Sequence, residues 1–502
     1  MNQNTKQFSA DDNNFKLDDY YGSHMVFQRD QKQPICGVGR DQSEIKVTLK
    51  QNGKTIQEHS VLTKQGRWQV ILNPESAGRN YELLIEENGV KKTHLCDLAF
   101  GDVFLFGGQS NMEYPLKDEA NYDDSFSLKN IRIYTVPRVE YIQVNQKFPA
   151  FENSGWKLAS SSALSDFSAI AAYTGQILNH LSEFNGSNEE EIPIGLVSCN
   201  KGGTSVSCWM DENSLKKDPD LYSHFYKRYW DDIQDQSDQT EDLKREEFAK
   251  ISRRYLEACN QFKIHHPKAS RAEMKRELGH TPWPGPKGKK DFGRPCGLFE
   301  TMFSNISGLP FKAVIWYQGE EDTKDGEFYE SLLLQLIECW RASIINRPDF
   351  YIVQLPGYND DPAKKWPLVR EAQRKVCSKL SYCHLITAID AGSSDNIHPA
   401  DKLKLGKRIG QFIYRHEYCK ESVSHPEIIE VIQSDQKTLV RFDQPLFVKN
   451  PDAGQDSNPA LIPIDLQDTI VFNKGQTSSA YENDPTPVYF YQDGSPLSPF
   501  TL

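Results

Sequence analysis

The sequence lacks long apolar segments and any surplus of basic residues. No apolar run approaches the roughly 20 residues that a bilayer-spanning helix needs. Asp and Glu (70) outnumber Lys and Arg (58), which gives a formal net charge of −12 at pH 7. Nucleic acids and anionic membranes attract clustered positive charge, so we expect neither as a partner.

Signals for export and for metal binding are also missing. Residues 1–15 are polar and contain no apolar signal-peptide core, so we expect either an intracellular protein or a mature form whose leader was removed. The ten cysteines are scattered, and none forms a Cys-x-x-Cys pair. We therefore expect mostly buried, reduced thiols, no metal site and no cofactor. The compartment and the oligomeric state stay open.

The N-terminal part of the chain has the pattern of β-structure. A chain of 502 residues is too long for one ordinary domain. After an N-terminus at 1–16 that we expect to be flexible, residues 17–98 contain alternating strands such as Ile45-Lys-Val-Thr-Leu49. Asn52-Gly53 and Asn88-Gly89 supply hairpin turns. This pattern predicts a β-sandwich domain.

From residue 99 to 421 the pattern changes to α/β. Fully apolar strands alternate with amphipathic helices, which predicts a mostly parallel sheet covered on both faces. The predicted strands contain residues 103–106, 131–134, 194–197, 313–316, 351–353 and 385–389. A charged, helix-rich stretch at about 210–295 is predicted to be an insertion. Residues 422–502 return to strand and turn signals, which predicts a β-rich region packed on the other two.

A serine follows the first of these apolar strands. The segment Phe106-Gly-Gly-Gln-Ser110 leads from a strand through a glycine turn. In an open α/β sheet such a serine lies at the carboxyl edge, where ligands bind. The glycines permit a tight turn, and the serine N–H can face a developing oxyanion. The alternative is a plain turn with a helix-capping serine.

A histidine that could activate this serine precedes the last predicted helix. It stands in Asp395-Asn-Ile-His398-Pro. A serine hydroxyl is a poor nucleophile until a base accepts its proton, and histidine titrates near neutral pH. An aspartate three residues upstream can orient the imidazole. The alternative is a polar loop that merely begins a helix.

Two further polar motifs follow predicted strands. Gln318-Gly319-Glu320 comes after 313–316, and Gln318 could donate an amide N–H to an oxyanion. Gly202-Gly203 comes after 194–197 and offers backbone N–H groups, although an acidic loop and a plain turn are the respective alternatives. Because all four motifs follow strands of one sheet, we expect them to meet at its carboxyl edge.

The order of these motifs resembles the sialate O-acetylesterases of the SGNH hydrolase superfamily. The motifs are Gly-Gln-Ser110-Asn-Met, Gly202-Gly203-Thr, Trp-Tyr-Gln318-Gly-Glu320 and Asp395-x-x-His398-Pro. The resemblance covers nearly the whole chain apart from the N-terminus and the charged insertion. It implies an SGNH-type, flavodoxin-like three-layer domain, with Ser110 as the nucleophile and His398 as the base. It also implies an oxyanion hole formed by Ser110, Gly202 or Gly203, and Gln318.

The acid of the implied triad has three candidates. Asp395 has the spacing that is usual in the superfamily, and its three-residue lead suits contact with the far imidazole nitrogen. Relatives of the sialate type often have a different residue at that position. Glu320 and Asp390 therefore remain alternatives.

Three functions are compatible with these residues. The first is removal of O-acetyl groups from sialic acids by a Ser-His-Asp mechanism through an acetyl-enzyme. The second is deacetylation of xylan or another polysaccharide by the same triad. The third is a non-catalytic carbohydrate-binding protein, which would predict loss of triad residues. Sialate carries a carboxylate, so a positive side chain near Ser110 would favour the first function.

Overall fold

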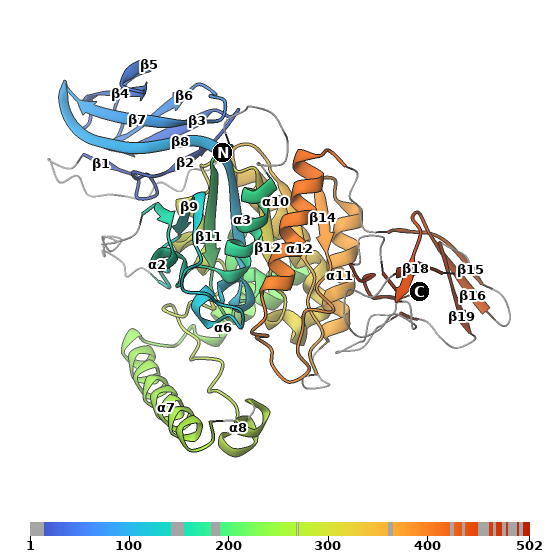
Figure 1. Cartoon of the computed structure of the whole chain (residues 1–502). Helices are drawn as coiled ribbons and strands as arrows, with labels where there is room; N and C mark the ends of the chain where they lie inside the picture. The colour runs from blue at the N-terminus through green and yellow to red at the C-terminus, as the bar shows by residue number, and fades with distance from the viewer. Residues whose placement is uncertain are drawn as a thin grey trace.

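The chain folds as a mixed α/β structure with additional β-rich regions at both ends (Figure 1). The computed structural model describes residues 15–141, 155–181, 191–267, 269, 271–359, 365–421, 426–433, 437–449, 461–464, 468–473, 478–479, 489–490 and 495–501. The expected flexible N-terminus lies outside these residues except for its last two positions. Within the described ranges, no helix is long and apolar enough to cross a bilayer. All ten cysteines are free thiols, and most are buried.

The N-terminal strands form two sheets that share one buried cluster. One sheet has the order β1 (Lys16–Leu17), β3 (Gln33–Val38) and β6 (Arg67–Leu72). The other joins β5 (Lys54–Leu62), β4 (Glu44–Gln51), β7 (Gly78–Glu87) and β8 (Val90–Gly108), with β2 (Val26–Gln28) parallel to β8. Both predicted Asn-Gly turns have positive φ at each residue, as a tight hairpin requires.

The central part of the molecule is a mostly parallel sheet, as the apolar runs predicted. Its order is β10 (Lys157–Ala159), β9 (Leu128–Thr135), β11 (Ile194–Asn200), β8, β12 (Ala313–Tyr317), β13 (Asp349–Val353) and β14 (Cys383–Ile386). Only β10 at the edge is antiparallel to its neighbour. After β8 the chain builds first one side of the sheet and then the other. The carboxyl end of β8 is therefore the topological switch point, where such sheets bind ligands.

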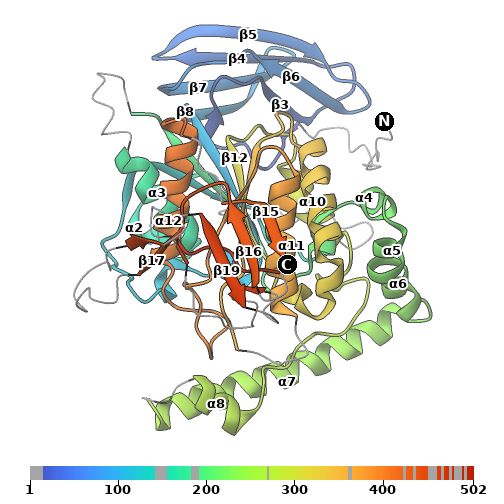
Figure 2. The same ribbon diagram turned by 90° about the vertical axis from the view of Figure 1, so that its right-hand side faces the viewer.

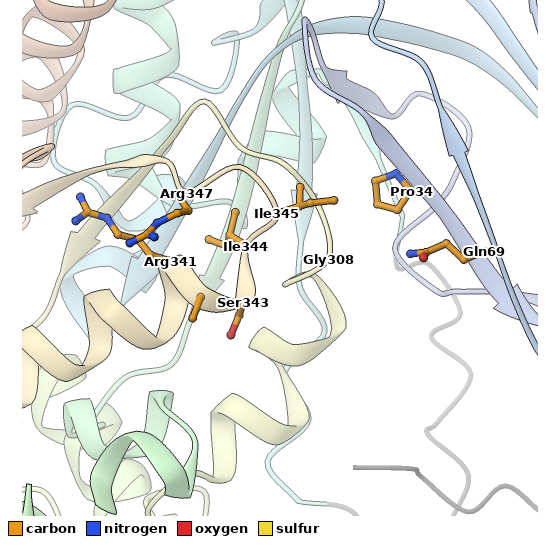
Figure 3. A pocket seen from close by; sticks show the side chains of 9 residues that line it. Pro34, Gln69, Gly308, Arg341, Ser343, Ile344, Ile345 and Arg347 are labelled. Atoms are coloured by element: carbon orange, nitrogen blue, oxygen red, sulfur yellow. The ribbon is translucent and has the colours of Figure 1, made fainter. Parts of the chain in front are cut away.

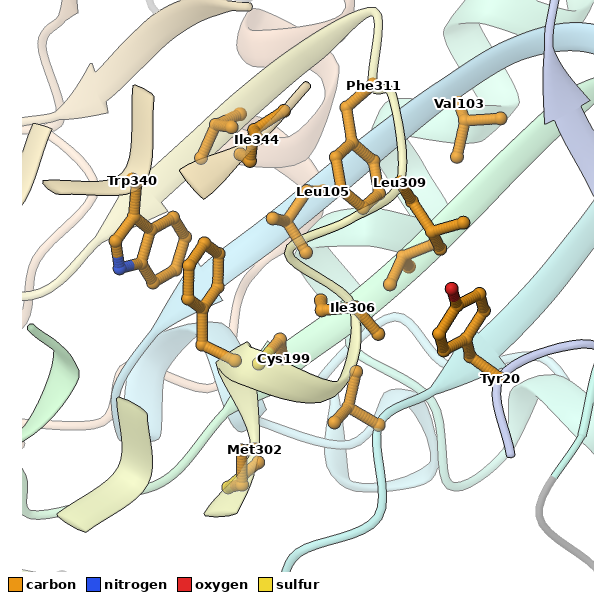
Figure 4. Close-up of a cluster of buried hydrophobic side chains, with 14 of the residues drawn as sticks. Tyr20, Val103, Leu105, Cys199, Met302, Ile306, Leu309, Phe311, Trp340 and Ile344 are labelled. Carbon is orange, nitrogen blue, oxygen red and sulfur yellow. The ribbon is translucent and has the colours of Figure 1, made fainter. Parts of the chain in front are cut away.

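The side chains of β8 alternate between two apolar cores. Val103 and Leu105 belong to the cluster that includes α10 (Tyr329–Ser343) and α11 (Trp366–Lys379), part of which is shown in Figure 4. Phe104 and Phe106 belong to the cluster that includes α3 (Ala169–Leu181) and α12 (Leu403–Ile413). Burial on both faces explains why the sequence shows a continuous apolar run here, without alternation.

β8 also joins the N-terminal sheets to the parallel sheet. It runs without interruption through the expected domain boundary at residues 98 and 99, so the division into domains stays a prediction. At this junction the buried Asp102 accepts hydrogen bonds from Arg29 (Nε, 2.9 Å) and from the Tyr418 hydroxyl (2.8 Å). Tyr418 ends a π-helical turn, η6 (Tyr414–Tyr418). One carboxylate thus ties β2, β8 and the end of α12 together.

The charged stretch at about 210–295 is helical, and its longest helix extends away from the sheet (Figures 1 and 2). Its helices are α4 (Glu212–Lys216), α5 (Pro219–Leu221), η3 (Tyr222–Lys227), α6 (Arg228–Asp232), α7 (Asp238–His265) and α8 (Arg271–Leu278). The remaining short helices are α1 (Ser110–Glu113), η1 (Leu116–Asp118), α2 (Ser161–Leu164), η2 (Val206–Trp209), α9 (Gly297–Thr301), η4 (Phe303–Asn305) and η5 (Glu321–Phe328).

The C-terminal region forms small antiparallel sheets around a core of its own. Its strands are β15 (Ile428–Gln433), β16 (Lys437–Phe442), β17 (Phe447–Lys449), β18 (Leu461–Pro463), β19 (Thr469–Asn473), β20 (Ser478–Ser479) and β21 (Phe500–Thr501). Gln354 donates to the buried Ser498 hydroxyl at 2.6 Å, and Thr387 donates to the Pro496 carbonyl at 2.9 Å. These bonds attach the chain end to the parallel sheet. The SGNH-type, three-layer assignment stays a prediction.

Close packing of α12 on α3 gives a test of the fold. A Cβ added at Gly410 would lie 2.7 Å from the Ile177 Cβ and 3.0 Å from the Thr174 carbonyl oxygen. We expect Gly410→Leu to lower the free energy of unfolding by about 1–3 kcal/mol, because neither atom can rotate away. This loss exceeds the gain of about 1 kcal/mol from replacing a helical glycine.

The measurement is the unfolding midpoint in urea, with Gly308→Leu as a control. Gly308 is exposed, and a Cβ there would meet nothing within 4 Å. Equal midpoints for the two variants would contradict tight contact between α3 and α12.

Candidate active site

The turn after β8 positions Ser110 and permits only glycine at one position. A Cβ on Gly108 (φ +141°) would overlap the carbonyl group of Tyr317 on the neighbouring strand β12. A Cβ on Gly107 would lie 3.0 Å from the ring of Trp316. The Gln109 N–H then donates to the Tyr317 carbonyl at 3.1 Å. The chain thereby turns across the end of β12, and Ser110 begins α1 at the carboxyl edge of the sheet.

The structure brings Ser110 and His398 together from opposite halves of the chain. The distance between Ser110 Oγ and His398 Nε2 is 2.7 Å. The loop between β14 and α12 holds the histidine: Asn396 accepts from the His398 N–H at 3.1 Å and donates to its carbonyl at 2.7 Å. Asn111 also donates to the Ile397 carbonyl at 3.0 Å. This is the contact that a serine nucleophile and its base require.

The three candidate acids lie in different environments. Asp395 is exposed and accepts a hydrogen bond from the Ser393 hydroxyl at 2.8 Å. Asp390 forms a two-pronged ion pair with Arg408 at 2.8 and 2.9 Å, and hydrogen bonds from Arg408 help to hold the pKa of that carboxyl at about 2 although burial opposes the shift. Glu320 is buried close to the serine. The choice of triad acid stays a prediction.

Glu320 belongs to a buried network that includes Asn111, the residue after Ser110. Asn111 donates to Glu320 Oε1 at 2.6 Å and accepts from Lys402 Nζ at 2.6 Å. Glu320 is 4% exposed and Lys402 is 1% exposed. Burial raises the pKa of Glu320 to about 7 and lowers the pKa of Lys402 to about 7, because each charged form loses its hydration.

Asn111 and Lys402 are site residues that the sequence analysis did not identify. Asn111 directly follows Ser110, and its amide reaches both Glu320 and the loop that carries His398. Lys402 follows His398 by four residues, directly before α12, and its backbone N–H also donates to Glu119 at 2.9 Å. For Asn111 the available signal was a polar residue directly after Ser110, whereas nothing in the sequence around Lys402 indicated its part in the site.

The two glycines that we expected as oxyanion donors differ in their position relative to Ser110. A Cβ on Gly202 would lie 3.2 Å from the Ser110 Cβ, so the Gly202 backbone lies against the nucleophile, although its N–H donates to Glu113. Gly203 (φ +70°) lies under the Trp283 ring. Whether either glycine binds an oxyanion stays a prediction.

Gln318 is engaged elsewhere. Its Nε2 donates to the Thr204 carbonyl at 2.9 Å and to Asp322 at 2.6 Å, and its Oε1 accepts from the Tyr329 hydroxyl at 3.0 Å. The side chain is fully buried. Both amide hydrogens thus donate to protein acceptors. These hydrogen bonds fix the loop of Thr204 to the end of β12. These bonds do not favour its expected role as an oxyanion donor, which stays a prediction.

Two other features of the described residues lie apart from the serine. Asp349, His384 and His416 bring possible metal-ligating atoms within 4.8 Å of one another, at the amino ends of β13 and β14 and so at the opposite edge of the sheet. A pocket of about 520 Å³ lies between β3, β6 and the end of α10 (Figure 3). None of the expected site residues lines it. Neither feature can take part in a reaction at Ser110.

Comparisons with known proteins agree with the motifs. Residues 293–415 match the family model described as a carbohydrate esterase, sialic acid-specific acetylesterase. This segment contains Gln318, Glu320, Asp390, Asp395 and His398, whereas Ser110 lies outside it.

Curated relatives match over a longer stretch. Sialate O-acetylesterase of Mus musculus is 23% identical over 481 residues, which cover 87% of this chain and 81% of the relative. That of Homo sapiens is 22% identical over 476 residues, which cover 87% and 78%. A solved structure of a carbohydrate acetylesterase from Xanthomonas citri has a TM-score of 0.68 at 23% identity, covers 97% of this chain and 99% of its own, and shows a shared fold. The resemblance that the motifs predicted is confirmed: the chain is similar to the sialate O-acetylesterases over most of its length and shares its fold with a carbohydrate acetylesterase, which supports an esterase.

Proposed function

We propose that this chain removes acetyl groups from O-acetylated carbohydrates, with Ser110 as the nucleophile and His398 as its base. The observation that carries the proposal is the 2.7 Å contact between Ser110 Oγ and His398 Nε2 at the switch point of the sheet. A non-catalytic binding protein would have no need to keep a base within hydrogen-bonding distance of a serine. The geometry supports hydrolysis over binding alone.

The reaction proceeds through an acetyl-enzyme. His398 accepts the Ser110 proton as Oγ attacks the acetyl carbonyl, and the tetrahedral oxyanion is held by the Ser110 N–H and by Gly202 or Gly203. The imidazolium then gives its proton to the departing sugar oxygen. Water, deprotonated by His398, attacks the acetyl group and restores the serine as acetate leaves. We propose Asp395 as the acid that orients His398, with Glu320 as the alternative.

Two sugar classes compete as the substrate. The names of the relatives indicate O-acetylated sialic acid. A neutral polysaccharide such as acetylated xylan is favoured by a different observation. Three described cations near the site are paired with carboxylates: Arg138 with Glu113 (3.1 Å), Lys201 with Glu140 (2.8 Å) and Lys324 with Glu321 (2.9 Å). A fourth, Lys402, is 1% exposed and donates to Asn111. An acetate-release assay on O-acetylated sialic acid, acetylated xylo-oligosaccharides and ethyl acetate distinguishes the two classes.

Replacing the nucleophile tests the proposal directly. We expect Ser110→Ala to lower acetate release by at least about a thousandfold, because the hydroxyl forms the acyl-enzyme. Its unfolding midpoint should stay near that of the wild type. Ser378→Ala, a change at an exposed serine on α11, serves as the matched control and should keep full activity. Turnover by Ser110→Ala above about a thousandth of the wild-type rate would refute nucleophilic catalysis by this serine.

Three amide variants test the acid. If Asp395 orients His398, Asp395→Asn should lose on the order of 10⁴ in kcat, because the amide can stabilise the wrong imidazole tautomer. Glu320→Gln should lose less. Asp390→Asn should mainly lower thermal stability, since Asp390 pairs with Arg408. A Glu320→Gln variant as inactive as Ser110→Ala, beside an active Asp395→Asn variant, would move the acid to Glu320.

The buried carboxyl of Glu320 gives a pH prediction. Its pKa is raised from 4.5 to about 7. Between these values the folded chain keeps a proton that the unfolded chain has released, so the stability contributed by Glu320 falls as pH rises, by at most about 1.4 kcal/mol per pH unit. The lowered pKa of Lys402 acts in the opposite direction, but only above about pH 7.

The measurement is urea unfolding of wild type and Glu320→Gln at three pH values between 5 and 7. We expect the advantage of the wild type over the variant to shrink as pH increases. An advantage that stays constant with pH would show that Glu320 is ionised throughout this range.

A further inference from the structure

An exposed tryptophan from the charged insertion lies beside the catalytic serine. Trp283 follows α8 and is 48% exposed, although large aromatic side chains are usually buried. A Cβ on Gly203 would lie 2.5 Å from its ring, so the indole rests on the Gly203 backbone. The preceding residue, Gly202, lies against Ser110. Trp283 therefore contacts Gly203, which directly follows the glycine that packs against Ser110.

A second aromatic ring and a hydrogen bond fix the indole. The Phe292 ring centroid lies 6.0 Å from that of Trp283, and Lys201 Nζ lies 4.6 Å from the Phe292 centroid. The indole N–H donates to Glu321 Oε2 at 3.3 Å. Glu321 begins η5, directly after the loop of Gln318 and Glu320. The ring is thus held between two of the motifs that form the site, with part of its surface still open.

The insertion holds the loop that carries Trp283. Glu241 on α7 is 2% exposed and accepts the backbone N–H groups of Lys289 (2.9 Å) and Lys290 (2.8 Å). The Tyr229 hydroxyl donates to the Gly288 carbonyl at 3.0 Å. A buried carboxylate with two backbone donors is a strong, directional anchor. α7 therefore acts as a support that presents the 279–296 loop to the serine.

We propose that Trp283 is the surface on which the sugar ring of the substrate stacks, and that the ring is that of a neutral, acetylated glycan. This inference rests on the proposed function and extends it to a substrate-binding residue and a substrate class. The C–H face of a pyranose is apolar, and an indole supplies a large, rigid apolar surface with few rotatable bonds. Arg138, Lys201 and Lys324 are each paired with a carboxylate, so a substrate carboxylate would have to compete for them with Glu113, Glu140 or Glu321. Lys402 is buried and donates to Asn111.

The test compares Trp283→Ala, Trp283→Phe and Leu256→Ala. Leu256 lies on α7 of the same insertion and is 60% exposed, so its replacement controls for a change of insertion surface. The substrates are acetylated xylo-oligosaccharides, O-acetylated sialic acid and ethyl acetate, which has no ring. We expect Trp283→Ala to raise KM for the xylo-oligosaccharides roughly tenfold with little change in kcat. Trp283→Phe should lie between, and activity on ethyl acetate should stay unchanged in all three.

Support from α7 is tested by Glu241→Gln. Because the amide is a weaker acceptor for two backbone donors, this variant should raise KM for the xylo-oligosaccharides and leave ethyl acetate hydrolysis unaffected. A purely structural role would instead lower both activities together.

The outcomes separate this inference from the proposed function. Loss of Trp283→Ala activity on ethyl acetate as well as on the sugar would refute stacking. Unchanged KM for the xylo-oligosaccharides would refute it too. A wild-type kcat/KM that is higher for O-acetylated sialic acid would refute the neutral substrate. Failure of the wild type to release acetate from any substrate would instead overturn the proposed function.

Discussion

The close approach of Gly108 to the Tyr317 carbonyl determines where every reactive group can lie. Because only glycine fits there, β8 can end against β12 and turn the chain across the end of its neighbour. Ser110 is thereby placed between the ends of β11 and β12, with Gly202 beside it and the preceding Gln109 bonded to Tyr317. The long strand that leads to this turn also carries the N-terminal sheets, and Asp102 clamps their junction to Arg29.

The buried network behind Ser110 has a cost and a structural consequence. Two ionisable groups removed from water recover their hydration energy only when their hydrogen bonds are well formed. Here a single amide, that of Asn111, lies between Glu320 and Lys402 and also holds the loop of His398. Residues that follow three separate strands therefore depend on one side chain. Such an arrangement specifies the relative position of Ser110 and His398 more strictly than apolar packing would.

The sequence predicted the parts of this protein that depend on local pattern. Apolar runs, helical spacing and Asn-Gly turns indicated the sheets and helices, and the rule that parallel strands end at one edge brought Ser110 to His398. It could not predict contacts between residues far apart in the chain. The exposure of Asp395, the committed amide of Gln318 and the link from Asn111 to Lys402 depend on side-chain directions at the sheet edge. The sequence did not show that β8 is one continuous strand. Its first part mixes exposed and buried residues, whereas its second part is apolar and buried on both faces.

The position of Trp283 shows why the role of the insertion could not be predicted from its sequence. A charged helical stretch usually indicates a solvated surface, and most of α7 is solvated. Its few buried groups have a different role, because Glu241 faces the backbone of the following loop and not solvent. That loop returns to the sheet edge and meets Gly203, a residue whose positive φ and missing side chain leave space for an indole. The catalytic edge thus supplies the chemistry, while a separate element shapes the surface on which a substrate would rest.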